Sequence, residues 1–109
     1  MEALKELVNV YAPATGELIM QYEEMPASQA GEIMNKSKRA FLSWSQLDID
    51  ERLCYLKQLR HTIANRLDEI AELISKDTGK VKTDALVADI MPALDAISHI
   101  EKHAKKTFK

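Results

Sequence analysis

The residues whose types could support catalysis or metal binding are one cysteine and three histidines. Cys54 is the only thiol, and a nucleophilic thiol needs a base within hydrogen-bond reach. The nearest histidine in the sequence, His61, lies two helical turns further along a predicted helix, so we interpret Cys54 as a structural thiol. His99 and His103 have the i, i+4 spacing that places two imidazoles on one helix face, but zinc sites normally use three or four protein ligands. We interpret both as surface or interface residues and predict no metal site.

Two glycines and two aspartates are the other candidates. Gly16 and Gly79 lie outside the GxGxxG and GxxxxGK[ST] motifs that bring backbone amides to phosphate, so we interpret them as turn and helix-cap residues. Asp89 and Asp95 interrupt an apolar segment, where a buried carboxylate is costly unless it is paired. Either they bond to partners outside this chain, or they form the polar stripe of an amphipathic helix. Most other acidic residues fall on polar helix faces or at helix starts, and no acid/base pair is predicted.

Trp44 and Phe41 lie near the end of the first predicted helix. Large aromatic side chains anchor partners at interfaces, but at helical spacing they more often pack in a core. We therefore predict that both residues pack between the first two helices. The residues considered so far predict no catalytic, cofactor-binding or metal-binding site within this chain.

Length and composition place the chain in a broad class. With 109 residues it is one domain at most. Its formal net charge is only -2, so neither nucleic acid nor a membrane surface is predicted as a partner. No stretch has the continuous apolar core of a membrane span or a signal peptide. One cysteine permits no internal disulfide, and we expect a cytoplasmic protein.

The first predicted element is a β-hairpin within residues 1–25. Residues 7–11 and 18–22 are rich in β-branched and aromatic side chains, which favour strands. Between them, Pro13 presets a turn and Gly16 is able to take the positive φ of a longer loop with a bulge. Two strands alone are marginally stable, so we expect a helix or further strands to cover the hairpin.

A three-helix region is predicted over residues 26–109. Pro26 and Ser28 mark the start of its first helix. The third helix runs from about residue 82 toward residue 106 and is apolar on nearly every side between residues 85 and 97, which predicts burial against more than one neighbour. Pro92 lies inside this segment and predicts a kink or a helix restart.

The central helix is predicted to run uninterrupted from Asp48 to Gly79. Apolar residues recur through it at spacings of three, four and seven. Asp48 and Glu51 have the spacing of a capping box, and Gly79 provides a left-handed cap. Such a helix would span roughly 40 Å, whereas a compact chain of this size has a radius of gyration of roughly 13 Å. Either the helices form an elongated bundle, or the helix is shaped to lie across a larger body.

Four stretches have a familiar order and spacing. They are Tyr11–Glu17 (YAPATGE), Lys38–Trp44 followed by Glu51 and Arg52, Leu67–Leu73, and Asp77–Lys80. In these stretches the chain resembles the start of the aldehyde dehydrogenase superfamily, whose first hairpin carries an NPATGE sequence. Ala12 stands where asparagine is usual, which leaves the loop conformation open. The resemblance covers essentially the whole chain, and it implies a mainly α piece of a larger α/β cofactor domain: a β-hairpin followed by three long helices.

The resemblance implies an enzyme that oxidises an aldehyde to a carboxylic acid with NAD or NADP. In this family a cysteine thiolate attacks the aldehyde, hydride passes to the nicotinamide, and a glutamate-activated water hydrolyses the thioester. A backbone amide and an asparagine side chain stabilise the oxyanion. These groups lie after the region matched here, so none maps onto this chain, and Cys54 is not the family nucleophile. We expect the 109 residues alone to be inactive.

The resemblance also explains the long central helix, because the family's first hairpin and helices wrap the outside of the cofactor domain. We therefore expect residues 1–109 to be a single incomplete domain, truncated before the nucleotide-binding strands and the catalytic domain. Phe108, between lysines, favours a chain that continues. The expected partners are the remainder of the parent enzyme and further copies of this chain. The alternative is a free-standing helical interaction or scaffold module without enzymatic activity.

Overall fold

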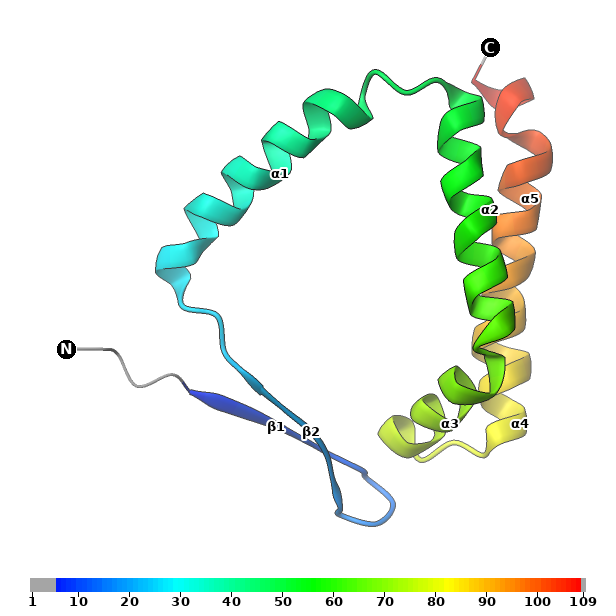
Figure 1. Ribbon diagram of the computed structural model, residues 1–109. Helices are drawn as coiled ribbons and strands as arrows, with labels where there is room; N and C mark the ends of the chain where they lie inside the picture. Colours follow the sequence, from blue (N-terminus) through cyan, green and yellow to red (C-terminus); the bar gives the residue numbers. More distant parts are fainter. Residues whose placement is uncertain (1–5, 109) are drawn as a thin grey trace.

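The computed structural model describes residues 6–108, which form an open arch (Figure 1). Residues 1–5 of the predicted hairpin region, and Lys109, lie outside the described residues. The radius of gyration is 18.8 Å. The predicted mainly α fold with an N-terminal hairpin is confirmed. The elements are β1 (Leu7–Tyr11), β2 (Leu18–Glu23), η1 (Ala27–Gln29), α1 (Ala30–Trp44), α2 (Ile49–Asn65), α3 (Leu67–Thr78), α4 (Lys82–Asp84), η2 (Ala85–Ile90) and α5 (Met91–Thr107).

The hairpin forms where the sequence predicts it. β1 and β2 pair antiparallel, with a register shift between Val10 and Tyr11. The loop is closed by two backbone hydrogen bonds of 2.8 Å, from the Ala12 amide to the Glu17 carbonyl and from the Gly16 amide to the Ala12 carbonyl. Gly16 has a φ of 75°, a conformation in which a Cβ would be strained. Backbone hydrogen bonds therefore close the loop at Ala12, and the Thr15 hydroxyl adds a contact by accepting from the Glu17 amide at 3.3 Å.

The prediction of one uninterrupted helix from Asp48 to Gly79 is wrong. Its caps are confirmed, because Asp48 and Glu51 form the reciprocal capping box and Gly79 takes a φ of 77°. At Arg66, however, the backbone leaves helical geometry (φ -108°, ψ 22°), and α3 turns away from the axis of α2 (Figure 1). No proline or glycine causes this bend. The bend lets α3 pack against η2 while α2 packs against α5, so both halves of the apolar stripe find a neighbour.

The third predicted helix forms as one continuous helical stretch made of α4, η2 and α5. Its η2 turns are π-helical, and the Met91 amide donates to the Leu86 carbonyl, five residues back. Regular α-helix resumes at Met91, which puts Pro92 in the first turn of α5. Since proline has no amide to donate and fits the first turn of a helix best, the restart predicted at Pro92 is confirmed. π-helical turns are rare and occur mostly as single turns within α-helices.

The hydrophobic core is small and lies where α3 meets η2. Ala71 and Ala85 are fully buried and Ile90 is nearly so. Partly buried side chains surround them: Ile63, Leu67, Ile70, Ile74, Leu86 and Leu94. The apolar segment thus contacts two neighbours, as predicted, but Val87 and Met91 stay more than half exposed.

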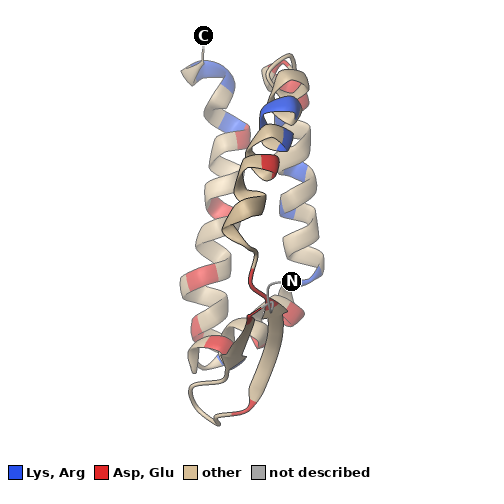
Figure 2. Cartoon of the chain, turned by 90° about the vertical axis from the view of Figure 1, so that its left-hand side faces the viewer, with Lys and Arg blue, Asp and Glu red and all other residues tan. Residues whose placement is uncertain are grey.

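Ion pairs connect the packed elements along their length. Lys82 pairs with Asp68 at 3.1 Å, between α4 and α3, and Lys105 pairs with Asp50, between α5 and the start of α2. Charges of both signs are spread along the helices (Figure 2). Exposed ion pairs of this kind contribute little to stability. No helix in the described part of the chain is long and apolar enough to cross a membrane.

Candidate functional site at the hairpin loop

A hollow of about 480 Å³ lies between the hairpin loop and the C-terminal end of α3. The two sides approach each other at Gly79, where a Cβ would lie 3.7 Å from Pro13 Cγ and 4.0 Å from Ala14 Cβ. Two of the stretches that resemble the aldehyde dehydrogenases, Tyr11–Glu17 and Asp77–Lys80, therefore lie against each other. The lining residues are Ala12, Ala14, Thr15, Glu17, Leu18, Ile19, Ser75, Lys76, Gly79 and Lys80.

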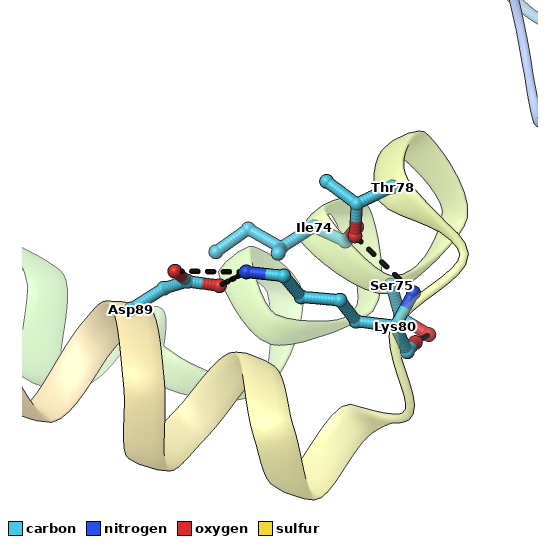
Figure 3. Close-up of polar contacts among 5 residues, drawn as sticks. All are labelled: Ile74, Ser75, Thr78, Lys80 and Asp89. Atoms are coloured by element: carbon cyan, nitrogen blue, oxygen red, sulfur yellow. Dashed lines mark hydrogen bonds and ion pairs between the residues drawn. The ribbon is translucent and has the colours of Figure 1, made fainter.

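Polar contacts hold the α3 side of this hollow in place (Figure 3). The Ser75 hydroxyl donates to the Lys80 carbonyl at 2.6 Å, and the Thr78 hydroxyl donates to the Ile74 carbonyl at 2.6 Å. The Lys80 ammonium reaches both carboxylate oxygens of Asp89 in η2, at 2.8 and 3.1 Å. Asp89 therefore has a partner within the chain, which neither of the two alternatives from the sequence had included. Asp95 is exposed, which agrees with the polar stripe.

The chemistry of this site is structural rather than catalytic. The Ser75 and Thr78 hydroxyls donate hydrogen bonds to backbone carbonyls. The positive charge of Lys80 is compensated by the carboxylate of Asp89. A nucleophilic hydroxyl needs a general base beside it, and these hydroxyls have carbonyl partners instead. These contacts fix the turn that follows α3. The hairpin loop lies against this turn at Gly79.

Neither the two loop glycines nor the start of α2 offers a phosphate site for a dinucleotide cofactor. Gly79 is a helix C-cap and Gly16 closes a hairpin loop, so neither offers its amide at the start of a helix, where phosphates bind. The first turn of α2 is occupied by the Asp48 and Glu51 carboxylates, with Asp50 beside them, and negative charge there opposes a pyrophosphate.

The histidines and the cysteine lie apart from the hollow, on α2 and α5. Cys54 is an exposed free thiol on α2. The His99 and His103 rings lie 4.3 Å apart on the exposed side of α5. Among residues 6–108, no group of three or more His, Cys, Asp or Glu side chains is arranged to hold a metal ion.

Arg60 and Glu101 form a polar contact that the sequence pattern does not predict. The Arg60 guanidinium on α2 donates to both carboxylate oxygens of Glu101 on α5, at 2.6 and 3.3 Å. This hydrogen bonding lowers the pKa of Glu101 and raises the pKa of Arg60, against an opposing effect of desolvation. The residues are 41 positions apart, so no local spacing indicates the pair. The contact between Lys80 and Asp89, nine positions apart, is hidden from the sequence for the same reason.

The prediction that both aromatic residues of α1 pack between the first two helices is wrong for Phe41, whereas Trp44 packs there in part. Phe41 is 63% exposed and Trp44 is 43% exposed. The Trp44 ring lies against Tyr55 on α2, with a ring centroid distance of 5.2 Å. The arch carries α1 away from the other helices (Figure 1), so most of its apolar stripe stays exposed. An open groove remains at this corner, lined by Ser37, Ala40, Phe41, Ser43, Trp44, Leu47 and Tyr55.

Comparison with known proteins identifies the class to which this hairpin-and-helix fold belongs. The model of the aldehyde dehydrogenase family matches residues 1–109. The chain therefore belongs to the aldehyde dehydrogenase family.

Individual relatives agree with the family match. The chain is 32% identical over 98 residues to the 4,4'-diapolycopene aldehyde oxidase of Methylomonas sp, an alignment that covers 90% of this chain and 18% of that protein. It is 34% identical over 87 residues to the betaine aldehyde dehydrogenase of Vibrio vulnificus (strain CMCP6), covering 80% and 18% respectively. The chain thus spans less than a fifth of the length of these relatives. No solved structure gave a significant match.

Proposed function

We propose that this chain is the N-terminal segment of an NAD(P)-dependent aldehyde dehydrogenase, and that the activity belongs to the longer enzyme. That enzyme would oxidise an aldehyde to a carboxylic acid through a cysteine thioester. The observation that carries the proposal is the family match along residues 1–109. By itself the chain would be non-catalytic.

Within the enzyme, this segment would contribute an outer layer of the cofactor domain. The support is physical: α1 buries no side chain, and large apolar residues are exposed on every helix longer than three residues. Contiguous exposed apolar surface marks a region that another protein surface covers. The remainder of the enzyme would supply that surface, together with the nucleotide-binding strands and the catalytic residues.

The aldehyde is not specified by this segment. Relatives are named for betaine aldehyde and for methylmalonate or malonate semialdehyde. A panel of candidate aldehyde substrates should therefore include these compounds. We place the enzyme in the cytoplasm, where an exposed free thiol such as Cys54 stays reduced, and we expect it to be a homo-oligomer.

The test is the intact mass of the gene product in its own cells, detected with an antibody against residues 26–108. A species several times heavier than 12.3 kDa is expected, and the purified protein should form NAD(P)H with at least one aldehyde of the panel. A product of 12.3 kDa without such activity would instead favour the second candidate, a free-standing helical interaction module. The exposed groove at the α1–α2 corner is the observation that supports an interaction module.

A further inference from the structure

Two exposed histidines lie side by side on α5, outside both the hairpin-loop hollow and the α1–α2 corner groove. His99 and His103 stand one turn apart in the regular α-helix of α5. Their ring centroids are 4.3 Å apart, with an angle of 34° between the ring planes. Within residues 6–108 neither imidazole has a hydrogen-bond or ion-pair partner. Each neutral ring therefore has a nitrogen lone pair to offer a ligand.

The distance between the two rings is close to that of two imidazoles bound to one metal ion. With metal–nitrogen bonds of about 2.1 Å, two imidazole centres lie about 4.5 Å apart at a nitrogen–metal–nitrogen angle of 90° and about 5.2 Å apart at the tetrahedral angle. The observed 4.3 Å is closer to the first value. Neighbouring positions at 90° belong to square-planar and octahedral ions, and imidazole nitrogen suits Cu²⁺ and Ni²⁺ among them.

The surroundings of the pair define an open site rather than the closed zinc site considered from the sequence. No third His, Cys, Asp or Glu of the described residues completes a metal-binding group, so water fills the remaining positions. Asp95 lies one turn before His99. Lys102 and Lys106, which follow the two histidines at a spacing of three, oppose the charge of Asp95. The binding therefore comes from the imidazoles and not from the local charge.

We propose that His99 and His103 chelate one divalent transition-metal ion per chain, with Cu²⁺ and Ni²⁺ bound more tightly than Co²⁺ and Mn²⁺. The two ligands stand on consecutive turns of α5, so one ion bridges those turns. An ion that binds only this helical arrangement also stabilises the folded chain. The site is independent of the aldehyde dehydrogenase activity proposed above, because it uses no residue of the hairpin-loop hollow.

Isothermal titration calorimetry with NiCl₂ tests the proposal on the tag-free chain carrying Cys54→Ser, which removes the only thiol. One Ni²⁺ per chain is expected. His99→Ala and His103→Ala should each weaken binding roughly tenfold or more, because a single imidazole loses the gain from the second, linked ligand. His61→Ala is the matched control, since this third histidine is exposed on α2, and it should leave the affinity unchanged. All three side chains are exposed, and circular dichroism should show unaltered helix content.

A change of spacing separates a chelate from binding to single imidazoles. His99→Ala combined with Ala96→His, at an exposed position of α5, keeps the number of histidines but places the two on α5 seven residues apart. Seven residues of α-helix span roughly 10 Å, which is too far for two imidazoles to share an ion. This variant should bind Ni²⁺ as weakly as His99→Ala alone. Ni²⁺ should raise the melting temperature of the parent chain and leave that of the variant unchanged.

Three outcomes would overturn the proposal: affinity that survives the loss of either α5 histidine, equally tight binding by the spacing variant, or a stoichiometry of one ion per two chains. The aldehyde oxidation assay of the longer enzyme is a separate measurement, so failure of the metal site and failure of the proposed function are distinguishable.

Discussion

The two arms of the arch differ in how their helices are held. In the arm formed by α2, α3, η2 and α5, buried alanines and Ile90 pack at the centre and ion pairs cross between helices. In the arm formed by the hairpin and α1, the strands are held by backbone pairing and α1 buries nothing. The sequence carries local signals for the elements of both arms. The difference shows that local signals suffice to form an element, whereas a packed core requires a neighbour.

The largest contrast is expected from removing one buried side chain in the packed arm. Ile90 is 2% exposed, and Ile90→Ala should cost about 2–5 kcal/mol because a cavity remains in a core that is already small. Ile33→Ala, made in α1 where the side chain is 43% exposed, should cost far less. Urea unfolding followed by circular dichroism measures both. Equal losses would show that the two arms are equally packed.

Enlarging a side chain should also destabilise the packed arm more than α1, but by a smaller amount than removing one. Ala71 is fully buried against Ala85, so Ala71→Leu should push α3 away from η2 and cost about 1–3 kcal/mol. Ala30→Leu at the exposed start of α1 should change the unfolding free energy by no more than about 0.5 kcal/mol. Thermal unfolding of the two variants side by side checks this. A neutral Ala71→Leu would mean that α3 and η2 are loosely packed.

A third test compares Gly79, which needs a positive φ, with Gly31, which lies inside the α1 helix. Gly79 has a positive φ, so Gly79→Ala should destabilise by about 1–2 kcal/mol. The added methyl would make only ordinary contacts with Pro13 and Ala14, so the cost lies in the backbone. Gly31→Ala, inside α1 with open space around it, should stabilise by about 0.5–1 kcal/mol. Chemical denaturation midpoints should therefore move in opposite directions, and a shared direction would contradict this account.

The smallest effect is expected from pH and the Arg60–Glu101 pair. Hydrogen bonding to Arg60 lowers the pKa of Glu101 in the folded chain. A carboxylate with a depressed pKa contributes stability that is fully present above the ordinary glutamate value, about 4.3, and is lost as the pH falls through the folded value. Glu101→Gln should remove this part of the acid dependence. Melting temperatures of the two proteins should differ near neutral pH and converge in acid; a constant difference would rule out the linkage.

The Arg66–Glu69 pair is the control for that measurement. Its geometry is also bidentate and also lowers the pKa of Glu69, mainly through the hydrogen bond. Both side chains are mostly exposed and lie within one turn of the chain. Glu69→Gln should therefore leave the packing of α2 on α5 unchanged, and its influence on the acid dependence should be slighter.

Much of the local structure follows from neighbouring residues alone. The capping box at Asp48 and Glu51 needs only two side chains three residues apart, and the positive φ of Gly16 and Gly79 reflects the absence of a Cβ. The same holds for the helix restart at Pro92. Each of these features is decided within a few residues, so the amino-acid sequence by itself determines it.

What only the tertiary structure decided involves residues far apart in the chain. The bend at Arg66 has no local signal; it exists because α3 packs Ala71 against η2. The Arg60–Glu101 contact and the seating of the hairpin loop at Gly79 depend on how the helices fold back. The exposure of Phe41 likewise cannot be predicted from the sequence pattern. An apolar stripe indicates that a helix face is buried against another surface, but it does not indicate whether the same chain provides that surface.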